Sequence, residues 1–139
     1  METFDNISEI TSEEDWREAA EVLRALRPTL DIEQFVVRRV TLIREGYRLL
    51  SKRENGRIVS IASYTISPHA VMGREMLIHD MATKPDAQGA GHASTLLAAL
   101  TTIARSQGCG RLFVHTRNAA QFYERNGFAV YSTGMILAH

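Results

Sequence analysis

The chain has 139 residues, a length that suits one compact domain burying about two thirds of its unfolded surface. Its acidic and basic residues balance to a formal net charge of zero, which argues against a general nucleic-acid binder because no basic stripe offers phosphate contacts. No apolar run approaches the roughly 20 residues of a membrane span, so we expect neither a nucleic acid nor a membrane as a partner.

The first third of the chain predicts two helices. A hydroxyl residue followed by acids at 11–15 is typical of a capped helix start, and apolar residues then recur at helical spacing until Pro28. Asp31, with Gln34 three residues later, predicts a second helix that ends at Gly46. The residues expected on the buried faces are Trp16, Ala19, Ala20, Leu23 and Leu26 in the first helix and Ile32, Phe35, Val36, Val40 and Ile43 in the second.

The middle of the chain predicts a three-stranded antiparallel meander. Strands are expected at 47–53 and 57–66, joined through Asn55-Gly56, which is the strongest short hairpin signal. The segment 67–73 contains proline and glycine and is expected to be a loop, and 74–83 reads as the third strand.

The last part of the chain predicts helices and strands in alternation. A helix at 94–107, a short strand at 111–116, a short helix at 118–126 and a final strand at 128–137 are expected. The crossover from the third strand through a helix should place the next strand parallel to it. The expected fold class is α+β, a single domain over 1–139 whose mixed sheet combines an antiparallel meander with a β-α-β-α-β half.

A glycine turn at 88–93 (Gln-Gly-Ala-Gly-His-Ala) separates the third strand from the long helix. A strand that turns straight into a helix leaves backbone N–H groups unpaired at the positive end of the helix dipole, which is an anion site. Glycines also remove side chains that would keep an anion away from the backbone. The alternative is a tight connection without a ligand. Because 87–123 contains no Asp or Glu but does contain Arg105 and two further arginines, we favour a site for a polyanionic ligand.

Two motifs make the chain similar to the GNAT superfamily of N-acetyltransferases. Residues 88–93 fit the family pattern Q/R-x-x-G-x-G/A at every fixed position, and residues 119–128 match A-x-x-F-Y-x-x-x-G-F. The resemblance covers nearly the whole chain and implies the GNAT fold. It implies an enzyme, an N-acetyltransferase that moves the acetyl group of acetyl-CoA to a primary amine of a small molecule or peptide, by direct attack in a ternary complex.

The resemblance also implies how acetyl-CoA is bound. Its pyrophosphate would lie on the backbone of the glycine turn, and its pantetheine arm would pair with the end of the preceding strand. The residues implied are Met81, Ala82, Thr83, Gln88, Gly89, Ala90, Gly91, His92, Ala93, Asn118, Phe122 and Tyr123. The family commonly has an Asn where this chain has Thr116, so either Thr116 substitutes or Asn118 serves, and Asn118 is also explained as a helix cap.

Two residues are the implied catalytic groups. Tyr123 occupies the position that the family uses to protonate the leaving thiolate, and the alternative is a core aromatic. Asp80, just before the strand end, would hold the substrate ammonium or take its proton through water, and the alternative is that it fixes a neighbouring loop. His79 should point to the opposite face of the strand. His115 is a further candidate base, although a lone histidine at a strand end is more often structural.

Other chemistry has little support in the sequence. The histidines show no metal-ligand spacing, so no metal is expected, and the lone Cys109 excludes an intrachain disulfide and favours a reducing cytoplasm. A dinucleotide-binding oxidoreductase is disfavoured because its third glycine is replaced by Ser94. A non-catalytic domain that binds acetyl-CoA as a sensor or partner stays open as the alternative function.

The acceptor amine and the oligomeric state are not fixed by the sequence. The expected acceptor rim, between the first two helices, carries Asp31 and Glu33, which would attract a cationic amine but are also well placed as first-turn helix acids. The apolar final strand at 128–137 could pair across an edge and form a homodimer.

Overall fold

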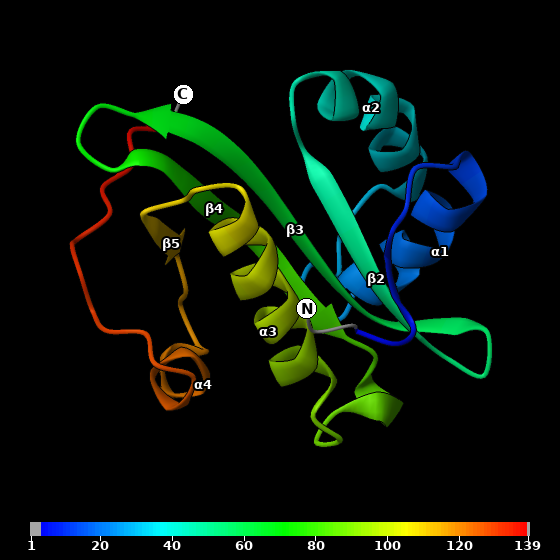
Figure 1. Cartoon of the computed structure of the whole chain (residues 1–139). Helices are drawn as coiled ribbons and strands as arrows, with labels where there is room; N and C mark the ends of the chain where they lie inside the picture. Colours follow the sequence, from blue (N-terminus) through cyan, green and yellow to red (C-terminus); the bar gives the residue numbers. More distant parts are fainter. Residues whose placement is uncertain (1–3, 139) are drawn as a thin grey trace.

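A five-stranded mixed sheet forms the centre of the computed structural model, which describes residues 4–138. The strands follow the chain order in space: β1 (Ile7–Glu9), β2 (Arg48–Glu54), β3 (Arg57–His69), β4 (Gly73–Thr83) and β5 (Arg111–Val114). All neighbours are antiparallel except β4 and β5, which are parallel. The helices are α1 (Glu13–Leu23), α2 (Ile32–Arg44), α3 (His92–Ser106) and α4 (Ala120–Arg125). The α+β class and the parallel crossover are therefore confirmed (Figure 1).

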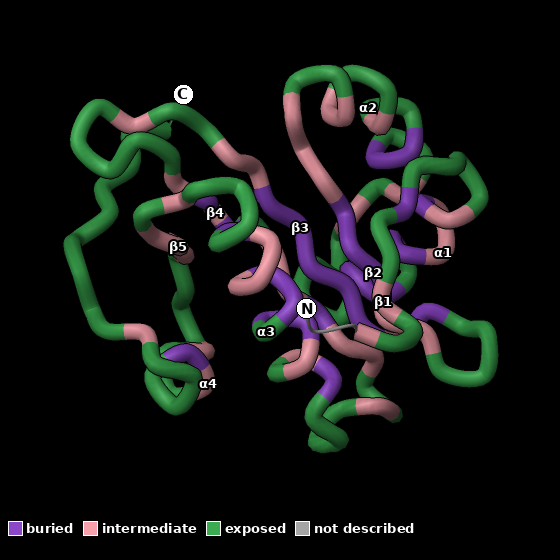
Figure 2. The backbone as a smooth tube through the Cα atoms, viewed as in Figure 1, coloured by how far each residue is buried: buried purple, intermediate pink, exposed green. Residues whose placement is uncertain are grey.

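Two hydrophobic cores cover opposite faces of the sheet. Side chains alternate along a strand, so Leu49 and Ile61 pack with α1 and α2, whereas Leu50 and Ala62 pack with α3. Figure 2 shows the buried stretch along the middle of β2 and β3, between these helices. β4 is buried in both cores, which fixes the strand that leads to the glycine turn.

The two helix starts predicted from the sequence are confirmed, but the predicted buried faces of these helices are confirmed only in part. The Ser12 hydroxyl accepts a hydrogen bond from Asp15 N, and the Asp31 carboxylate accepts one from Gln34 N, each at 3.1 Å. α1 ends at Leu23, well before Pro28, so the expected burial of Leu26 is wrong. The same is true of Val40. It is exposed because α2 packs mainly on α1 and buries only a narrow stripe.

The hairpin at Asn55-Gly56 is confirmed, since both residues have positive φ, at 54° and 78°. The loop expected at 67–73 is wrong, because β3 continues to His69 and pairs there with the start of β4. The His69 Nδ1 accepts hydrogen bonds from the backbone N–H groups of Val71 and Met72, which closes a much shorter turn.

The final strand expected at 128–137 is also wrong. Beyond the hydrogen bond from Phe128 N to Tyr123 O, the described part of this segment has no backbone hydrogen bond, although its sequence is apolar. Figure 1 shows it rising from α4 along the outside of the molecule. The sequence missed β1, which is only three residues long. His139 lies outside the described residues.

No helix within residues 4–138 has the length and apolar character needed to cross a membrane.

Trp16 is the anchor of the core between α1 and the sheet, and its loss should be severe. The side chain is fully buried, its ring packs in tilted orientations near the rings of Phe35 and Tyr47, and its Nε1 donates to Ile10 O at 2.9 Å. We expect Trp16→Ala to lower the free energy of unfolding by about 3–5 kcal/mol, through lost burial and a cavity. Urea unfolding followed by circular dichroism measures this, with the exposed Val37→Ala as the control. A loss no larger than that of the control would contradict the assignment.

Candidate functional site

The turn that joins β4 to α3 exposes a row of free backbone donors. A short 3₁₀ turn at Pro85–Ala87 leads into Gly89 and Gly91, both with φ of 84°. A Cβ atom at either position would meet no described atom within 4 Å, so space does not require glycine here. The left-handed backbone does, because residues with a side chain rarely adopt it. Within the described chain, no N–H group of residues 88–94 donates a hydrogen bond, since the first helical bond runs from Thr95 N to Gly91 O. Unpaired donors therefore gather at the positive end of the α3 dipole, as an anion site requires.

His92, the first residue of α3, is turned into the protein. Only 7% of its surface is exposed, and its Nε2 lies 3.2 Å from Oε2 of Glu54 at the end of β2. The buried Nδ1 has no hydrogen-bond partner within residues 4–138. No pattern in the sequence indicates this link between α3 and the β2–β3 hairpin. The imidazole holds the turn in place, and the contribution of His92 to the anion site is its backbone N–H.

β4 has an unpaired edge next to this turn. Its pairing with β5 ends where Ile78 meets Val114, whereas its pairing with β3 continues to Thr83. Among the strands that the structure describes, residues 79–83 therefore have a neighbour on one side only. An extended ligand that carries amide groups can hydrogen-bond to such an edge as another strand would. The pantetheine contacts predicted at 81–83 lie on this edge.

Gln88 fixes the approach to the turn. Its side-chain Nε2 donates to Thr83 O at 3.2 Å, so the amide ties the turn back to the end of β4. The rest of the turn, from Gly89 to Gly91, is exposed. The sequence placed Gln88 among the cofactor-binding residues, and the structure gives it this bracing contact.

Tyr123, on α4, is mostly buried. Its ring packs between Phe122 and Phe128, with centroids 5.0 and 5.4 Å away. Burial is the main cause that raises the pKa of its phenol, and the negative charge of Asp80 raises it further. The hydroxyl is therefore protonated at neutral pH, as it would also be at the ordinary phenol pKa of 10.0 and as a proton donor must be. The core position and the donor role predicted from the sequence are therefore compatible.

Asp80 forms an ion pair with Arg27 in the connection between α1 and α2. Its Oδ1 accepts from Arg27 Nη2 at 2.7 Å and from Nε at 3.1 Å, and its backbone N donates to Ser63 Oγ at 3.1 Å. This ion pair supports the interpretation in which Asp80 fixes a neighbouring loop. Burial is the main cause that raises the pKa of Tyr47 and of Tyr123, and the charge of Asp80 raises both further. The base role of Asp80 stays a prediction.

His79 lies in a β-bulge. Ser63 pairs with Asp80 and Tyr64 with Ile78, so His79 is the extra residue between them and the simple alternation expected for His79 and Asp80 is broken. The His79 ring stacks on Tyr47 with centroids 5.5 Å apart, and its Nε2 lies 2.9 Å from Thr65 Oγ1. Burial lowers the pKa of His79, which favours the neutral imidazole.

Two other predicted site residues, His115 and Asn118, have different surroundings. His115 is exposed beyond β5 and contacts the ring of Phe113, with no described contact to Asp80 or Tyr123. The cap role of Asn118 is wrong, because α4 starts later and Thr116 Oγ1 instead accepts from Ala119 N at 3.0 Å. The predicted cofactor contact of Asn118 is untouched by this finding.

The acids of the acceptor rim have structural partners. Asp31 caps α2, and the Glu33 carboxylate accepts two hydrogen bonds from Arg17, at 3.1 and 3.0 Å. Arg17 in turn lowers the pKa of Glu33. Phe35 is buried against Trp16. The structure therefore shows Asp31 and Glu33 in the roles of first-turn helix acids.

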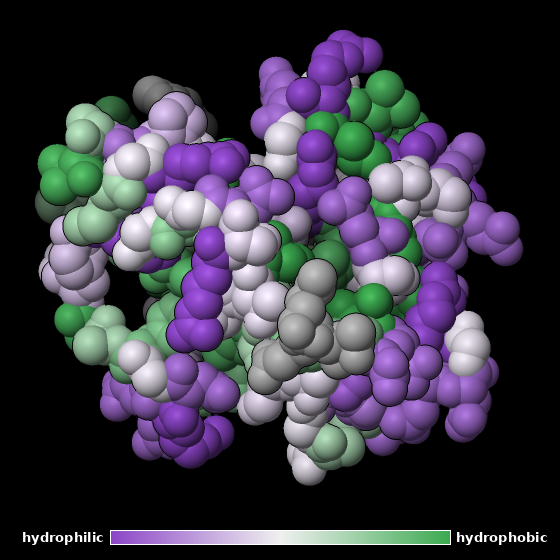
Figure 3. Space-filling view, in the orientation of Figure 1, coloured by the Kyte–Doolittle hydropathy of each residue, from purple (hydrophilic) through white to green (hydrophobic). Residues whose placement is uncertain are grey.

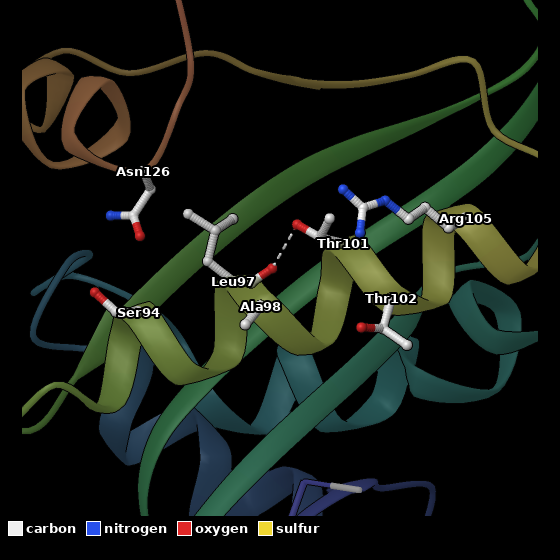
Figure 4. A pocket seen from close by; sticks show the side chains of 7 residues that line it. All are labelled: Ser94, Leu97, Ala98, Thr101, Thr102, Arg105 and Asn126. Carbon is white, nitrogen blue, oxygen red and sulfur yellow. Dashed lines mark hydrogen bonds between the residues drawn. The ribbon is translucent and has the colours of Figure 1, made fainter. Parts of the chain in front are cut away.

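A shallow hollow of about 260 Å³ runs along the outer face of α3 (Figure 4). It extends from Ser94, next to the glycine turn, to Arg105, and Asn126 faces it from beyond α4. Its lining contains one cation and no carboxylate, which suits an anionic ligand. The sequence indicated Arg105 but not Asn126, which reaches this face only through the fold. Among residues 4–138, no group of three His, Cys, Asp or Glu could hold a metal ion.

The chain resembles known acetyltransferases in sequence and in fold. Residues 8–128 match the family described as Acetyltransferase (GNAT) family. An uncharacterized N-acetyltransferase of Bacillus subtilis (strain 168) is 26% identical over 133 residues, which cover 91% of this chain and 94% of that protein. The glucosamine 6-phosphate N-acetyltransferase of Trypanosoma brucei brucei is 31% identical over 93 residues, covering 65% of this chain and 63% of that protein. A crystal structure of a Trypanosoma brucei acetyltransferase superposes with a TM-score of 0.82 at 27% identity, over 96% of this chain and 98% of that one.

The buried phenols predict a loss of stability at high pH. Burial raises the pKa of Tyr47 from 10.0 to about 12, although a hydrogen bond with Ser63 acts against this shift. Above pH 10 the unfolded chain loses a phenol proton that the folded chain retains, so the free energy of unfolding falls as pH rises from 10 to 12. We expect Tyr47→Phe to lose less stability over this range in urea titrations, with Tyr131→Phe as an exposed control. An equal loss in Tyr47→Phe and the parent would contradict the assignment.

Proposed function

Because the chain belongs to the acetyltransferase (GNAT) family, we propose that it transfers the acetyl group of acetyl-CoA to a primary amine of a small molecule or peptide, by direct attack within a ternary complex. One observation carries the proposal. The free N–H donors of residues 88–94 lie at the end of the unpaired edge of β4, so one extended ligand can use both.

The residues of the turn fit the diphosphate of acetyl-CoA. Backbone N–H groups at a helix start are the donors that phosphate oxygens need, and no carboxylate between 87 and 123 opposes them. The edge at 81–83 fits the amides of the pantetheine arm. The hollow along α3, with Arg105 at its far end, offers further room for an anionic part of the ligand. Bound acetyl-CoA supplies the activated thioester, and the chain supplies its alignment.

Tyr123 is the proposed donor of the proton that the leaving thiolate needs. A phenol holds its proton at neutral pH already at its ordinary pKa of 10.0, and burial raises the pKa of Tyr123 further. A donor of this kind accelerates a reaction by about 10²–10⁴-fold when it is in hydrogen-bond reach of the leaving atom. Phe122 and Phe128 pack against its ring and limit the directions in which the hydroxyl can point.

Asp80 is the proposed partner of the acceptor amine. Its carboxylate is held beside the unpaired edge of β4 and is already occupied by a cation, the guanidinium of Arg27. An incoming ammonium takes the place of that guanidinium at Oδ1. The carboxylate then holds the ammonium or takes its proton through water, which leaves the neutral amine that attack requires.

An amino sugar phosphate is the first acceptor to test. The similarity to a glucosamine 6-phosphate N-acetyltransferase supports this choice. Arg27 supports it as well, because a guanidinium displaced from Asp80 remains at the rim and pairs well with a phosphate. Small amines without a phosphate and peptide N-termini complete the panel.

Acetyl-CoA binding should be weakened by a substitution of a glycine in the turn, and not by the substitution of a left-handed glycine elsewhere. We expect isothermal titration calorimetry to detect acetyl-CoA binding, and Gly91→Ala to weaken it at least tenfold, because the strained residue displaces the donors. Gly108→Ala is the matched control, since Gly108 has φ of 74°, ends the same helix, and has equally open surroundings. No heat with the parent protein, or equal weakening in both variants, would overturn the assignment of the turn.

Turnover should depend on the Tyr123 hydroxyl. We expect Tyr123→Phe to slow thiol release from acetyl-CoA in the presence of an amine by on the order of 10²-fold, with unchanged acetyl-CoA affinity. Tyr64→Phe, a buried tyrosine of the same core, is the control and should keep its turnover. Unchanged turnover in Tyr123→Phe would remove the donor role. Binding without thiol release across the whole amine panel would instead favour a non-catalytic acetyl-CoA sensor.

A further inference from the structure

Within residues 4–138, two polar contacts attach the glycine turn to the sheet. At the start of the turn, the Gln88 amide donates to Thr83 O of β4. At its end, the His92 imidazole lies against Glu54 of β2. The next residue of α3 that belongs to a hydrophobic core is Leu96, about one helical turn later. The direction of the free N–H groups at the start of α3 therefore depends on the contact of His92 more than on apolar packing.

His92 carries both a free donor and this contact. Within the described chain its backbone N–H is one of the unpaired donors, whereas its buried imidazole has Nε2 3.2 Å from Glu54 Oε2. Because an ionised carboxylate only accepts hydrogen bonds, the imidazole nitrogen that faces Glu54 carries a hydrogen. The Cα–Cβ bond has a fixed direction relative to the helix backbone. A fixed imidazole therefore also fixes the rotation of the first helical turn about its axis.

Glu54 lies on a hairpin that α1 braces from the other face of the sheet. Arg53 contacts α1, with Nη2 2.9 Å from Asp15 Oδ1, while the next residue, Glu54, contacts α3. The Glu18 carboxylate of α1 accepts from Ile58 N at 2.7 Å. Figure 1 shows the hairpin tip at the lower right, and Figure 3 shows hydrophilic residues gathered there. The Glu54 side chain is 58% exposed, yet its strand is held in place on both sides.

The charge of Glu54 by itself opposes an anionic ligand. Segment 87–123 has no acid, but Glu54 brings a carboxylate against the first residue of α3, close to the proposed diphosphate site. Like charges in this position repel each other. The contact with His92 acts in the opposite direction, because it holds the donors in place. Removal of the charge alone would strengthen the binding of an anion, whereas loss of the contact would weaken it.

We propose that Glu54 and His92 are positioning residues for acetyl-CoA. Their contact holds the first turn of α3 in the orientation in which its N–H groups meet the diphosphate. Donors that are already ordered bind more tightly, because the cost of ordering them is not taken from the binding free energy. The inference rests on the proposed function, in which acetyl-CoA binds the glycine turn. It adds that the β2–β3 hairpin sets the strength of this binding, whereas the chemical step at Tyr123 does not depend on the hairpin.

Isothermal titration calorimetry with acetyl-CoA tests the sign of the effect. We expect Glu54→Ala to weaken binding about tenfold, the effect of losing one polar contact with a charged group. Glu54→Gln keeps an acceptor oxygen without the charge and should recover most of the lost affinity. The control is Glu21→Ala, which removes an exposed acid of α1 that has no ion pair within the described chain and should bind as the parent does. Binding by Glu54→Ala as tight as that of the parent, or tighter, would overturn the positioning role.

A double-variant cycle tests whether the two residues act as one. His92→Leu fills the buried site without the imidazole, so we expect it to weaken binding as Glu54→Ala does. The double variant should bind no more weakly than the weaker single variant, because both changes remove the same contact. Losses that add would overturn the link between the two residues.

Kinetics and hydrogen exchange separate positioning from chemistry and from a general loss of stability. We expect Glu54→Ala to raise the KM for acetyl-CoA with kcat unchanged, the reverse of the effect of Tyr123→Phe. In the free protein, exchange at Thr95 N, which bonds to Gly91 O, should become faster in Glu54→Ala. A fall in kcat at constant KM would overturn the positioning role and leave the proposed function standing. No heat with the parent protein would overturn both.

Discussion

The parting of β4 and β5 is the constraint on which the site depends. The two parallel strands stay paired only as far as Ile78 and Val114, and β4 then continues to Thr83 with β3 as its one described strand neighbour. Ala82 packs in the core under α1 and α2, and Met81 packs against the core under α3, so this free edge belongs to a packed strand and is not a frayed end. The turn that follows adds the free donors of the α3 start. Two sets of backbone groups without partners therefore meet at one end of the sheet, and side chains need only orient what binds there.

The sequence predicted the elements whose signals are local. The hydroxyl-capped helix start at 11–15, the helix start at Asp31, the hairpin at Asn55-Gly56 and the glycine turn before α3 each depend on a few neighbouring residues, and all are present. The strand expected at 128–137 failed because an apolar pattern carries no information on backbone pairing, and within the described chain the segment beyond Phe128 makes no backbone hydrogen bond. Leu26 and Val40 failed for a related reason, since their burial depends on where α1 ends and on what α2 packs against.

The sequence predicted the backbone turn of the site better than it predicted the contacts of the side chains around it. Residues 88–93 form the turn that the motif indicated, with Gly89 and Gly91 in the left-handed backbone that glycine adopts readily. The ion pair between Asp80 and Arg27 joins residues far apart in the chain, and the bulge at His79 breaks the alternation that a strand pattern assumes. The link between the buried His92 and Glu54 has no signature either, because it joins two residues far apart in the chain.

The pairing of Arg27 with Asp80 has a thermodynamic consequence. Under the proposed function, an acceptor competes with a cation that is tethered to the same molecule and therefore present at a high effective concentration. The measured acceptor affinity is the intrinsic one reduced by this internal competition. Changes in the connection between α1 and α2 would then shift the concentration at which the enzyme responds to its amine, while the sheet and its bound thioester stay as they are.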